Sequence, residues 1–230
     1  MESNMINFVL ATDKPWHDAL YDNLQNSIKG AKWFRIQNKQ ELTHQKLSEI
    51  QPAYIFIPHW SYIIPSEIYE NFCCVVFHMT DLPYGRGGSP LQNLIVRGYK
   101  ETKISAIQVQ KGLDTGAVYL KKTLCLAGTA EEIFLRATTI IEEMIFEIIE
   151  KKLTPVPQVG EPVIFKRRKP EESNIAELEI IDQLYDYIRM LDCPGYPNAY
   201  LETKHFRLEF SRASLKSDES ILADVRITKK

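Results

Sequence analysis

The residues best suited to chemistry lie in a glycine-rich segment near the middle of the chain. Six of the ten glycines fall between Gly85 and Gly116, and such density marks backbone that adopts unusual dihedral angles or approaches a ligand closely. His78 stands just before this segment, at the end of a wholly apolar run over residues 72–77. Because ligands bind outside the carboxyl ends of strands in open α/β sheets, we expect His78 at a site, although a lone histidine there can also be a local hydrogen-bond partner.

The glycines form neither of the common nucleotide-binding motifs. The G-x-G-x-x-G spacing is absent after the first expected strand, and no G-x-x-x-x-G-K-[S/T] sequence occurs. Taken alone, the run Gly85-Arg86-Gly87-Gly88 could be no more than a tight turn. No His, Cys and Asp residues have the spacing of metal ligands, so no metal site is expected.

The elements that must position His78 alternate between strands and helices. Short apolar runs predict strands at residues 6–11, 33–36, 54–57, 72–77 and 104–109. After the first of them, apolar residues recur every four positions from Trp16 to Ile28 and predict a helix that Gly30 ends. Strands separated in this way imply βαβ units, and therefore an α/β fold with a Rossmann-like, mostly parallel sheet and helices on both faces.

The second half of the chain predicts two amphipathic helices and a hairpin. Apolar residues share one face between Ile133 and Ile148, and Thr129 with Glu132 forms a capping box at the start. Residues 153–158 are typical of a linker, and residues 165–170 of an exposed basic strand or loop. A second helix is expected to turn inward Ile180, Ile181, Leu184, Ile188 and Leu191, and residues 207–210 and 221–227 are expected to pair as a hairpin. The expected domains are an N-terminal domain over residues 1–155 and a small C-terminal extension over residues 156–230.

Composition excludes several classes of protein. Of 230 residues, 44% are hydrophobic and 25% are charged, which is a globular composition. The 28 basic and 30 acidic residues give a net charge of −2, so no overall basic field is expected to attract nucleic acid or an anionic membrane. No apolar run approaches the length of a membrane span.

The cysteines and the N-terminus indicate the compartment. Cys73, Cys74, Cys125 and Cys193 form no C-x-x-C pair, which argues against a disulfide framework and a zinc site. We expect four free thiols in a reducing cytoplasm. The N-terminus, residues 1–4, carries neither the basic nor the apolar region of a secretory signal, so no such signal is expected.

Three separated blocks resemble one enzyme family. Residues 78–83 read His-Met-Thr-Asp-Leu-Pro, residues 86–90 read Arg-Gly-Gly-Ser-Pro, and residues 112–116 read Gly-Leu-Asp-Thr-Gly. In this order, and with this separation of His78 from Asp114, they resemble the formyltransferases that use 10-formyltetrahydrofolate. The family pattern is N-x-H-x-S-L-L-P, then R-G-x-x-P, and later G-L-D-T-G. The resemblance extends over residues 50–150.

The resemblance implies roles for the catalytic residues. In the family chemistry a substrate amine attacks the formyl carbon, and negative charge develops on the formyl oxygen. His78 would stabilise that charge, while Asp114 would orient the imidazole and accept the amine proton, directly or through water. The family's catalytic asparagine, two residues before the histidine, is Val76 here. We expect Asn93 to supply a carboxamide in its place.

The resemblance also implies a folate site. The pterin-binding loop of the family corresponds to residues 59–65, so backbone groups of Tyr62, Ile63 and Ile64 are expected to pair with the pterin. The residues expected on the opposite wall are Val109, Gln110, Gly112 and Leu113. An apolar cleft with a few backbone polar groups suits a flat heterocycle. In the absence of the resemblance, Trp60 and Tyr62 would be interpreted equally well as core aromatics.

The form of the blocks, and the length of chain that follows them, are most similar to the sugar N-formyltransferases, including the pseudaminic-acid type, and to the formylation domains of peptide synthetases. We therefore expect the acceptor to be the amine of a nucleotide-linked amino sugar, such as a 4-amino-4,6-dideoxysugar for cell-surface polysaccharide. The residues expected to contact it are Trp60, Thr80, Tyr84, Arg86, Gly87 and Gly88. A homodimer through C-terminal elements is expected, and no nucleic-acid or membrane partner.

Three alternatives remain open. The acceptor could be an amino acid or the amine of an aminoacyl or peptidyl carrier. Water could replace the amine, so that the enzyme hydrolyses formyl-folate. Loss of the asparagine could also leave a folate-binding homologue without transfer activity.

Overall fold

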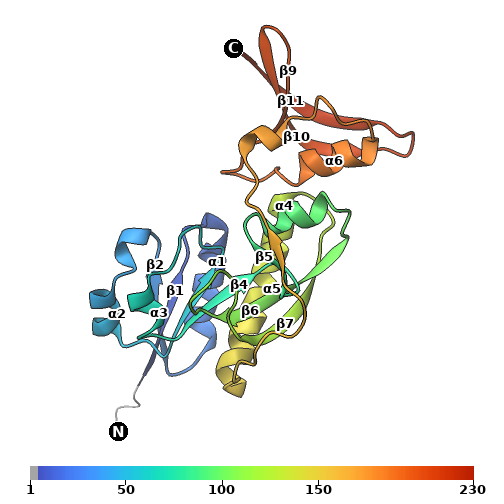
Figure 1. Cartoon of the computed structure of the whole chain (residues 1–230). Helices are drawn as coiled ribbons and strands as arrows, with labels where there is room; N and C mark the ends of the chain where they lie inside the picture. The colour runs from blue at the N-terminus through green and yellow to red at the C-terminus, as the bar shows by residue number, and fades with distance from the viewer. Residues whose placement is uncertain (1–4) are drawn as a thin grey trace. The chain divides into compact units, whose positions relative to one another are not determined.

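The computed structural model describes residues 5–230, so residues 1–4, on which the expectation about a signal sequence rests, lie outside it. The described chain has the predicted α/β fold, with a mainly parallel central sheet, helices, and antiparallel strands at its C-terminal end (Figure 1). Among the described residues, no helix is both long and apolar enough to cross a membrane.

The central sheet has six strands in the order β2-β1-β3-β4-β6-β7. Its strands are β1 (Ile6–Ala11), β2 (Ala31–Ile36), β3 (Tyr54–Pro58), β4 (Cys74–His78), β6 (Glu101–Gln108) and β7 (Val118–Cys125). β1 runs parallel to β2 and β3, and β3 runs parallel to β4, whereas β4 and β6 are antiparallel. The carboxyl ends of the four parallel strands therefore meet at one edge of the sheet.

The remaining elements connect and extend this sheet. The helices are α1 (Asp18–Ser27), α2 (His44–Ile50), α3 (Ser66–Tyr69), α4 (Pro90–Ile95), α5 (Ala130–Lys151) and α6 (Ile181–Arg189), with short 3₁₀ helices η1 (Pro15–His17), η2 (Lys39–Glu41) and η3 (Pro170–Ser173). The short strands β5 (Tyr84–Gly87) and β8 (Val163–Phe165) pair with each other. A third sheet contains β9 (Ala199–Glu202), β10 (Phe206–Leu215) and β11 (Ile221–Lys229) in the order β11-β10-β9.

The core follows from the alternation of side chains along the strands. Val9 and Ile57 of the parallel strands pack in one buried cluster with Leu47 of α2 and Ile68 of α3. Residues one position along a strand point to the opposite face. There the rings of Phe8 and Trp33 lie 5.0 Å apart between centroids, and the rings of Trp33 and Phe56 lie 5.9 Å apart. Both faces of the parallel strands are therefore covered, which explains their nearly continuous apolar sequences.

The predicted helices are present, with one difference in detail. At the start of α5 the Thr129 backbone N–H donates to Glu132 Oε2 at 2.7 Å and the Glu132 N–H donates to Thr129 Oγ1 at 3.2 Å, which confirms the capping box. The inward position predicted for Ile180 is wrong, because Ile180 precedes α6 as its N-cap residue and is 54% exposed. The predicted hairpin is confirmed as β10 and β11, which pair antiparallel.

The chain divides into two compact units whose segments interleave along the sequence. Unit 1 takes the residues up to Arg86, Lys103–Leu124 and Arg136–Ile164. Unit 2 takes Gly87–Thr102, Cys125–Leu135 and Phe165–Lys230. The division expected at residue 155 stays a prediction.

A buried arginine holds unit 2 together. Arg189, which is 3% exposed, donates to Asp186 Oδ1 at 2.6 Å and to the carbonyl oxygens of Leu126 and Gly128 at 2.6 and 2.8 Å. These bonds tie the end of α6 to the segment that leads into α5. A planar guanidinium with several fixed donors suits this arrangement, whereas a lysine could not reproduce it.

Replacing Arg189 should therefore destabilise the fold strongly. Arg189→Met leaves the carboxylate of Asp186 buried without its cation, and we expect the free energy of unfolding to fall by about 3–5 kcal/mol in urea titrations followed by circular dichroism. The double variant Arg189→Met/Asp186→Leu should recover part of that loss because it removes the unpaired charge. A loss below 1 kcal/mol for Arg189→Met would contradict this role.

Candidate active site

His78 is the last residue of β4 and lies at the edge where the parallel strands end. Its side chain is 9% exposed. Nε2 lies 2.7 Å from the carbonyl oxygen of Gly85, and Nδ1 lies 3.5 Å from Asp114 Oδ2. A carbonyl oxygen can only accept, so Nε2 carries a proton and donates to Gly85 O, while Nδ1 faces the carboxylate. The site therefore holds a fixed imidazole, with one ring nitrogen at a backbone carbonyl and the other facing a carboxylate.

The loop that carries Asp114 has a strongly constrained backbone. Asp114 itself has a φ of +52°, in the left-handed region, and Gly112 has a φ of +102°. A Cβ atom on Gly116 would lie 1.7 Å from the backbone oxygen of Gln108, so only glycine fits there. Gly112 and Gly116 thus allow the loop between β6 and β7 to turn sharply and bring the Asp114 carboxylate to His78.

Gln158 anchors this loop and was not predicted as a site residue. Its Nε2 donates to the carbonyl oxygens of Asp114 and Gly116, both at 2.8 Å. Its Oε1 accepts from Arg86 Nε at 3.1 Å and from Arg86 Nη2 at 2.7 Å. One carboxamide therefore joins the loop of Asp114 to Arg86 of β5, and the Arg86 guanidinium is engaged by the Gln158 side chain.

Val76 takes the place of the family's catalytic asparagine in an apolar setting. It packs against the buried cluster of Leu82, Ile107 and Val118, two residues before His78 on the same strand. The carboxamide of Asn93 is already engaged within unit 2, where Nδ2 lies within 3.1 Å of the carbonyl oxygens of Gly88, Ser89 and Lys166. These bonds give the amide a structural role, and the substitution of Asn93 for the missing asparagine stays a prediction.

The other residues predicted to contact the acceptor have different surroundings. Thr80 is fully buried and lies 3.4 Å from Gly85 O through its hydroxyl, so it supports the same carbonyl that His78 binds. A Cβ atom on Gly87 would lie 2.3 Å from Phe165 O, and one on Gly88 would lie 2.5 Å from Arg167 Cβ. These two glycines permit close backbone packing within unit 2. Tyr84, at the start of β5, is half-buried. Contact of any of them with an acceptor stays a prediction.

The loop expected to bind a pterin follows β3 and leaves its backbone available. Ile63 is 86% exposed and Tyr62 is 45% exposed, whereas Ile64 is buried and Trp60 is half-buried with its ring 5.5 Å from that of Tyr62. Within residues 5–230, no backbone–backbone hydrogen bond involves residues 60–64. Polar backbone groups beside apolar side chains fit the edge of a flat heterocycle.

The residues expected on the opposite wall follow β6. Val109 is half-buried, and Gln110, Gly112 and Leu113 are exposed. Val109 donates its N–H to Cys74 O at 2.8 Å, which ties the beginning of this segment to β4. The four residues lie in the same loop as Asp114, and folate binding by either wall stays a prediction.

The remaining chemistry-bearing residues give no further centre among the residues described. No group of three His, Cys, Asp or Glu side chains there could hold a metal ion. None of the four cysteines forms a disulfide bond, and burial raises the pKa of the Cys74 thiol to about 12, which leaves it unreactive at neutral pH.

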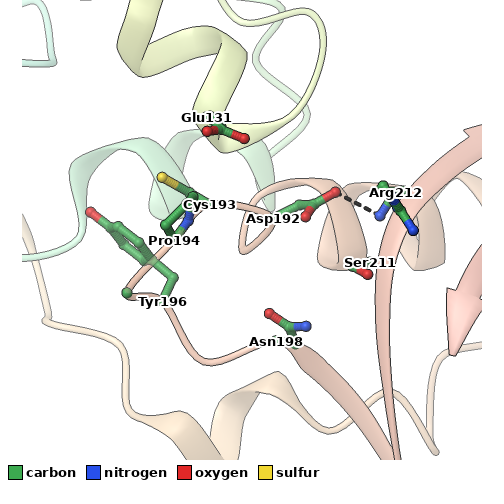
Figure 2. A pocket seen from close by; sticks show the side chains of 9 residues that line it. Glu131, Asp192, Cys193, Pro194, Tyr196, Asn198, Ser211 and Arg212 are labelled. Carbon is green, nitrogen blue, oxygen red and sulfur yellow. Dashed lines mark hydrogen bonds between the residues drawn. The ribbon is translucent and has the colours of Figure 1, made fainter. Parts of the chain in front are cut away.

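A pocket of about 390 Å³ lies in unit 2, and none of the residues predicted for the site lines it (Figure 2). It is lined by Glu131, Asp192, Cys193, Pro194, Gly195, Tyr196, Asn198, Ser211 and Arg212. Asp192 accepts the backbone N–H of Arg212 at 2.7 Å, so this carboxylate helps to fix the bulge in β10.

Comparison with known protein families assigns the class of the chain. The formyl transferase family model matches residues 15–140, and a model described as the methionyl-tRNA formyltransferase C-terminal domain matches residues 170–228. The first match covers more than half of the chain and contains His78, Asp114 and the loop after β3. The chain belongs to the formyl transferase family.

Particular relatives are similar to different extents. A solved structure named methionyl-tRNA formyltransferase from Clostridium thermocellum is 53% identical, with 98% of this chain and 100% of that chain covered and a TM-score of 0.94. A methionyl-tRNA formyltransferase from Thermodesulfovibrio yellowstonii is 28% identical over 74% of this chain. The matched region spans only 58% of the length of that relative.

Two more distant structures share the fold. HypX from Aquifex aeolicus in complex with tetrahydrofolic acid is 14% identical, with a TM-score of 0.75 over 92% of this chain and 38% of that chain. A 4-N formyltransferase from Francisella tularensis is 13% identical, with a TM-score of 0.66 over 96% and 97% of the two chains.

The anchoring role of Gln158 can be tested by hydrogen exchange. Gln158→Leu removes both donors to the Asp114 loop, and we expect amide exchange over residues 110–117 to accelerate by about tenfold, as for the loss of one to two buried hydrogen bonds. Gln158→Glu keeps an acceptor for Arg86 but cannot donate to Asp114 O or Gly116 O, so it should accelerate exchange similarly. Unchanged exchange in both variants would contradict the anchoring role.

Proposed function

We propose that the chain is an N-formyltransferase that moves a formyl group from 10-formyltetrahydrofolate to a primary amine. The observation that carries this proposal is the His78–Asp114 pair, 3.5 Å apart at the carboxyl edge of the sheet, in a chain of the formyl transferase family. Ligands of open α/β sheets bind at this edge.

The pair has the groups that the reaction needs. The donor supplies an activated formyl carbon. As the amine attacks that carbon, His78 shares its Nε2–H between Gly85 O and the formyl oxygen, where negative charge develops. Asp114 holds the imidazole in place through Nδ1 and accepts the proton that the amine loses, directly or through water. The new C–N bond replaces the bond to the folate nitrogen, which leaves with a proton.

The loop after β3 is the proposed contact for the donor. Its unpaired backbone groups over residues 60–64 can meet the polar edge of a pterin, while Ile64 and Trp60 supply an apolar floor. The similarity in fold to a HypX structure that contains tetrahydrofolic acid supports a folate at this family's site.

The proposed acceptor is the α-amine of an aminoacyl or peptidyl carrier, and methionyl-tRNA is the first acceptor to test. Relatives named methionyl-tRNA formyltransferase support it, above all the structure that is 53% identical over the whole length of both chains. The expectations of a nucleotide-linked sugar and of no nucleic-acid partner therefore lack support from the more similar relatives. The nucleotide-linked amino sugar is kept as the second acceptor, because sugar N-formyltransferases share the fold at 13–15% identity.

The catalytic pair is tested by substitution. His78→Ala removes the oxyanion donor and Asp114→Asn removes the proton acceptor, and each should lower turnover by about 10²-fold or more. The assay follows tetrahydrofolate release from 10-formyltetrahydrofolate. His205→Ala, in the loop between β9 and β10, is the matched control and should leave turnover unchanged. Full activity in folded His78→Ala and Asp114→Asn would refute the assignment.

The acceptor is tested with a mass-spectrometric panel. Purified protein and 10-formyltetrahydrofolate are incubated with methionyl-tRNA, free amino acids, and UDP- and dTDP-linked amino sugars. We expect the mass of one formyl group on the methionyl ester. Transfer to a sugar nucleotide would overturn the acceptor and keep the chemistry, release of formate alone would indicate a hydrolase, and folate binding without turnover would indicate a binding homologue.

A further inference from the structure

A second set of polar side chains lies at the edge where His78 stands and has no part in the proposed transfer. Thr12 follows β1, His59 follows β3 and Met79 follows β4. His17, at the end of η1, connects them. Thr12, His17 and Met79 are at most 2% exposed. Polar groups buried at this density need a reason, because each unpaired one is costly.

These side chains form one continuous row of contacts. Thr12 Oγ1 lies 2.6 Å from His17 Nδ1. His17 Nε2 lies 3.0 Å from His59 Nδ1, and the two rings stack with centroids 5.1 Å apart. His59 Nε2 lies 3.1 Å from Met79 Sδ. The row therefore spans the ends of three neighbouring parallel strands, β1, β3 and β4.

When both rings are neutral, the chemistry of its last member fixes the direction of every bond in the row. A thioether sulfur can only accept, so His59 Nε2 carries the proton and donates to Met79. His59 Nδ1 is then the acceptor of the neutral ring, and His17 Nε2 must donate to it. His17 Nδ1 consequently accepts from the Thr12 hydroxyl, whose oxygen accepts the backbone N–H of Lys14 at 3.2 Å.

The electrostatic surroundings agree with two neutral rings. Burial, followed by the neighbouring His59, Arg35 and Lys14, lowers the pKa of His17 to about 2. Burial, followed by Lys14, lowers the pKa of His59 to about 4. Protonation of His59 would place its Nδ1–H opposite the Nε2–H of His17.

One member of the row, His59, lies in the loop proposed to bind the pterin. His59 is the first residue of that loop and has a φ of +49°, in the left-handed region that disfavours an ordinary side chain. Contacts at both ring nitrogens hold this backbone conformation, and Lys14 Nζ donates to Ser61 Oγ at 3.2 Å from the same side. The exposed backbone of residues 60–64 depends on the turn that His59 begins.

We propose that Thr12, His17, His59 and Met79 form a hydrogen-bonded relay of fixed direction that positions the loop after β3 for folate. They are positioning residues, because they act through the loop and not on the reacting atoms. The inference rests on the proposed function, since it assigns the relay's purpose to the folate site.

The direction of the relay is measured on the wild-type protein by ¹⁵N-histidine NMR at pH 5.5. We expect both His17 and His59 as neutral rings with the proton on Nε2, although this pH is below the ordinary histidine pKa of about 6.5. A protonated ring, or a proton on Nδ1 of either residue, would overturn the relay. This readout does not depend on any activity.

The purpose of the relay is measured by tetrahydrofolate affinity in isothermal titration calorimetry. His17→Leu leaves His59 Nδ1 without its donor, and we expect affinity to fall by about tenfold or more. His17→Gln keeps an N–H for His59 and should stay within about threefold of wild type. Ile141→Ala, a fully buried site in α5, is the control for general destabilisation and should leave affinity unchanged.

The outcomes separate the relay from the function. Wild type that binds no tetrahydrofolate would overturn the folate function and the relay's purpose with it. Binding by wild type with equal affinity in His17→Leu would overturn the inference alone, as would an equal loss in Ile141→Ala. If His17→Leu does not fold, Met79→Leu carries the test, because it conserves volume and removes only the acceptor of His59 Nε2.

Discussion

The parallel pairing of β1, β3 and β4 is the constraint on which the rest of this molecule depends. It brings Thr12, His59 and His78, which are far apart in sequence, to one edge of one sheet. The apolar cores on both faces fix the register of these strands, and a slip of one residue would turn every side chain to the other face. The chemistry at the edge is therefore set by packing several residues away from it.

At that edge, a glycine and a glutamine fix the loop that positions the charged residues. The carboxylate of Asp114 reaches His78 because Gly116 approaches Gln108 O so closely that no Cβ atom would fit between them. Gln158 then fixes the loop from a segment that contributes no group to the reaction. Preorganisation of this kind means that little reorganisation remains when negative charge develops. An apolar residue suits position 76, because the neighbours of Val76 form an apolar cluster that would leave a carboxamide poorly solvated.

Continuous apolar runs made the buried parallel strands and α5 predictable, since burial on both faces leaves a clear signal in sequence. β7 gave no such signal because Lys121 and Lys122 interrupt it and much of it is only half-buried. His78 and Asp114 were predictable because they lie in local motifs. Gln158 was not, because it acts from an irregular segment between prolines that is typical of a linker. The pairing of His17 with His59 depends on strand order, which no local pattern contains.

The interleaving of the two units has a consequence for synthesis. The first segment of unit 2 begins at Gly87 and its last segment ends at Lys230, whereas the last segment of unit 1 ends at Ile164. Neither unit is a contiguous stretch, so no single truncation would release either of them intact. On the ribosome, Gly87–Thr102 and Cys125–Leu135 emerge well before the strands β9, β10 and β11 that complete their unit. During that interval the ring of Phe134 lacks Tyr196 and the carbonyl of Leu126 lacks Arg189, so this order of emergence sets the period in which unit 2 is incomplete and a chaperone would act.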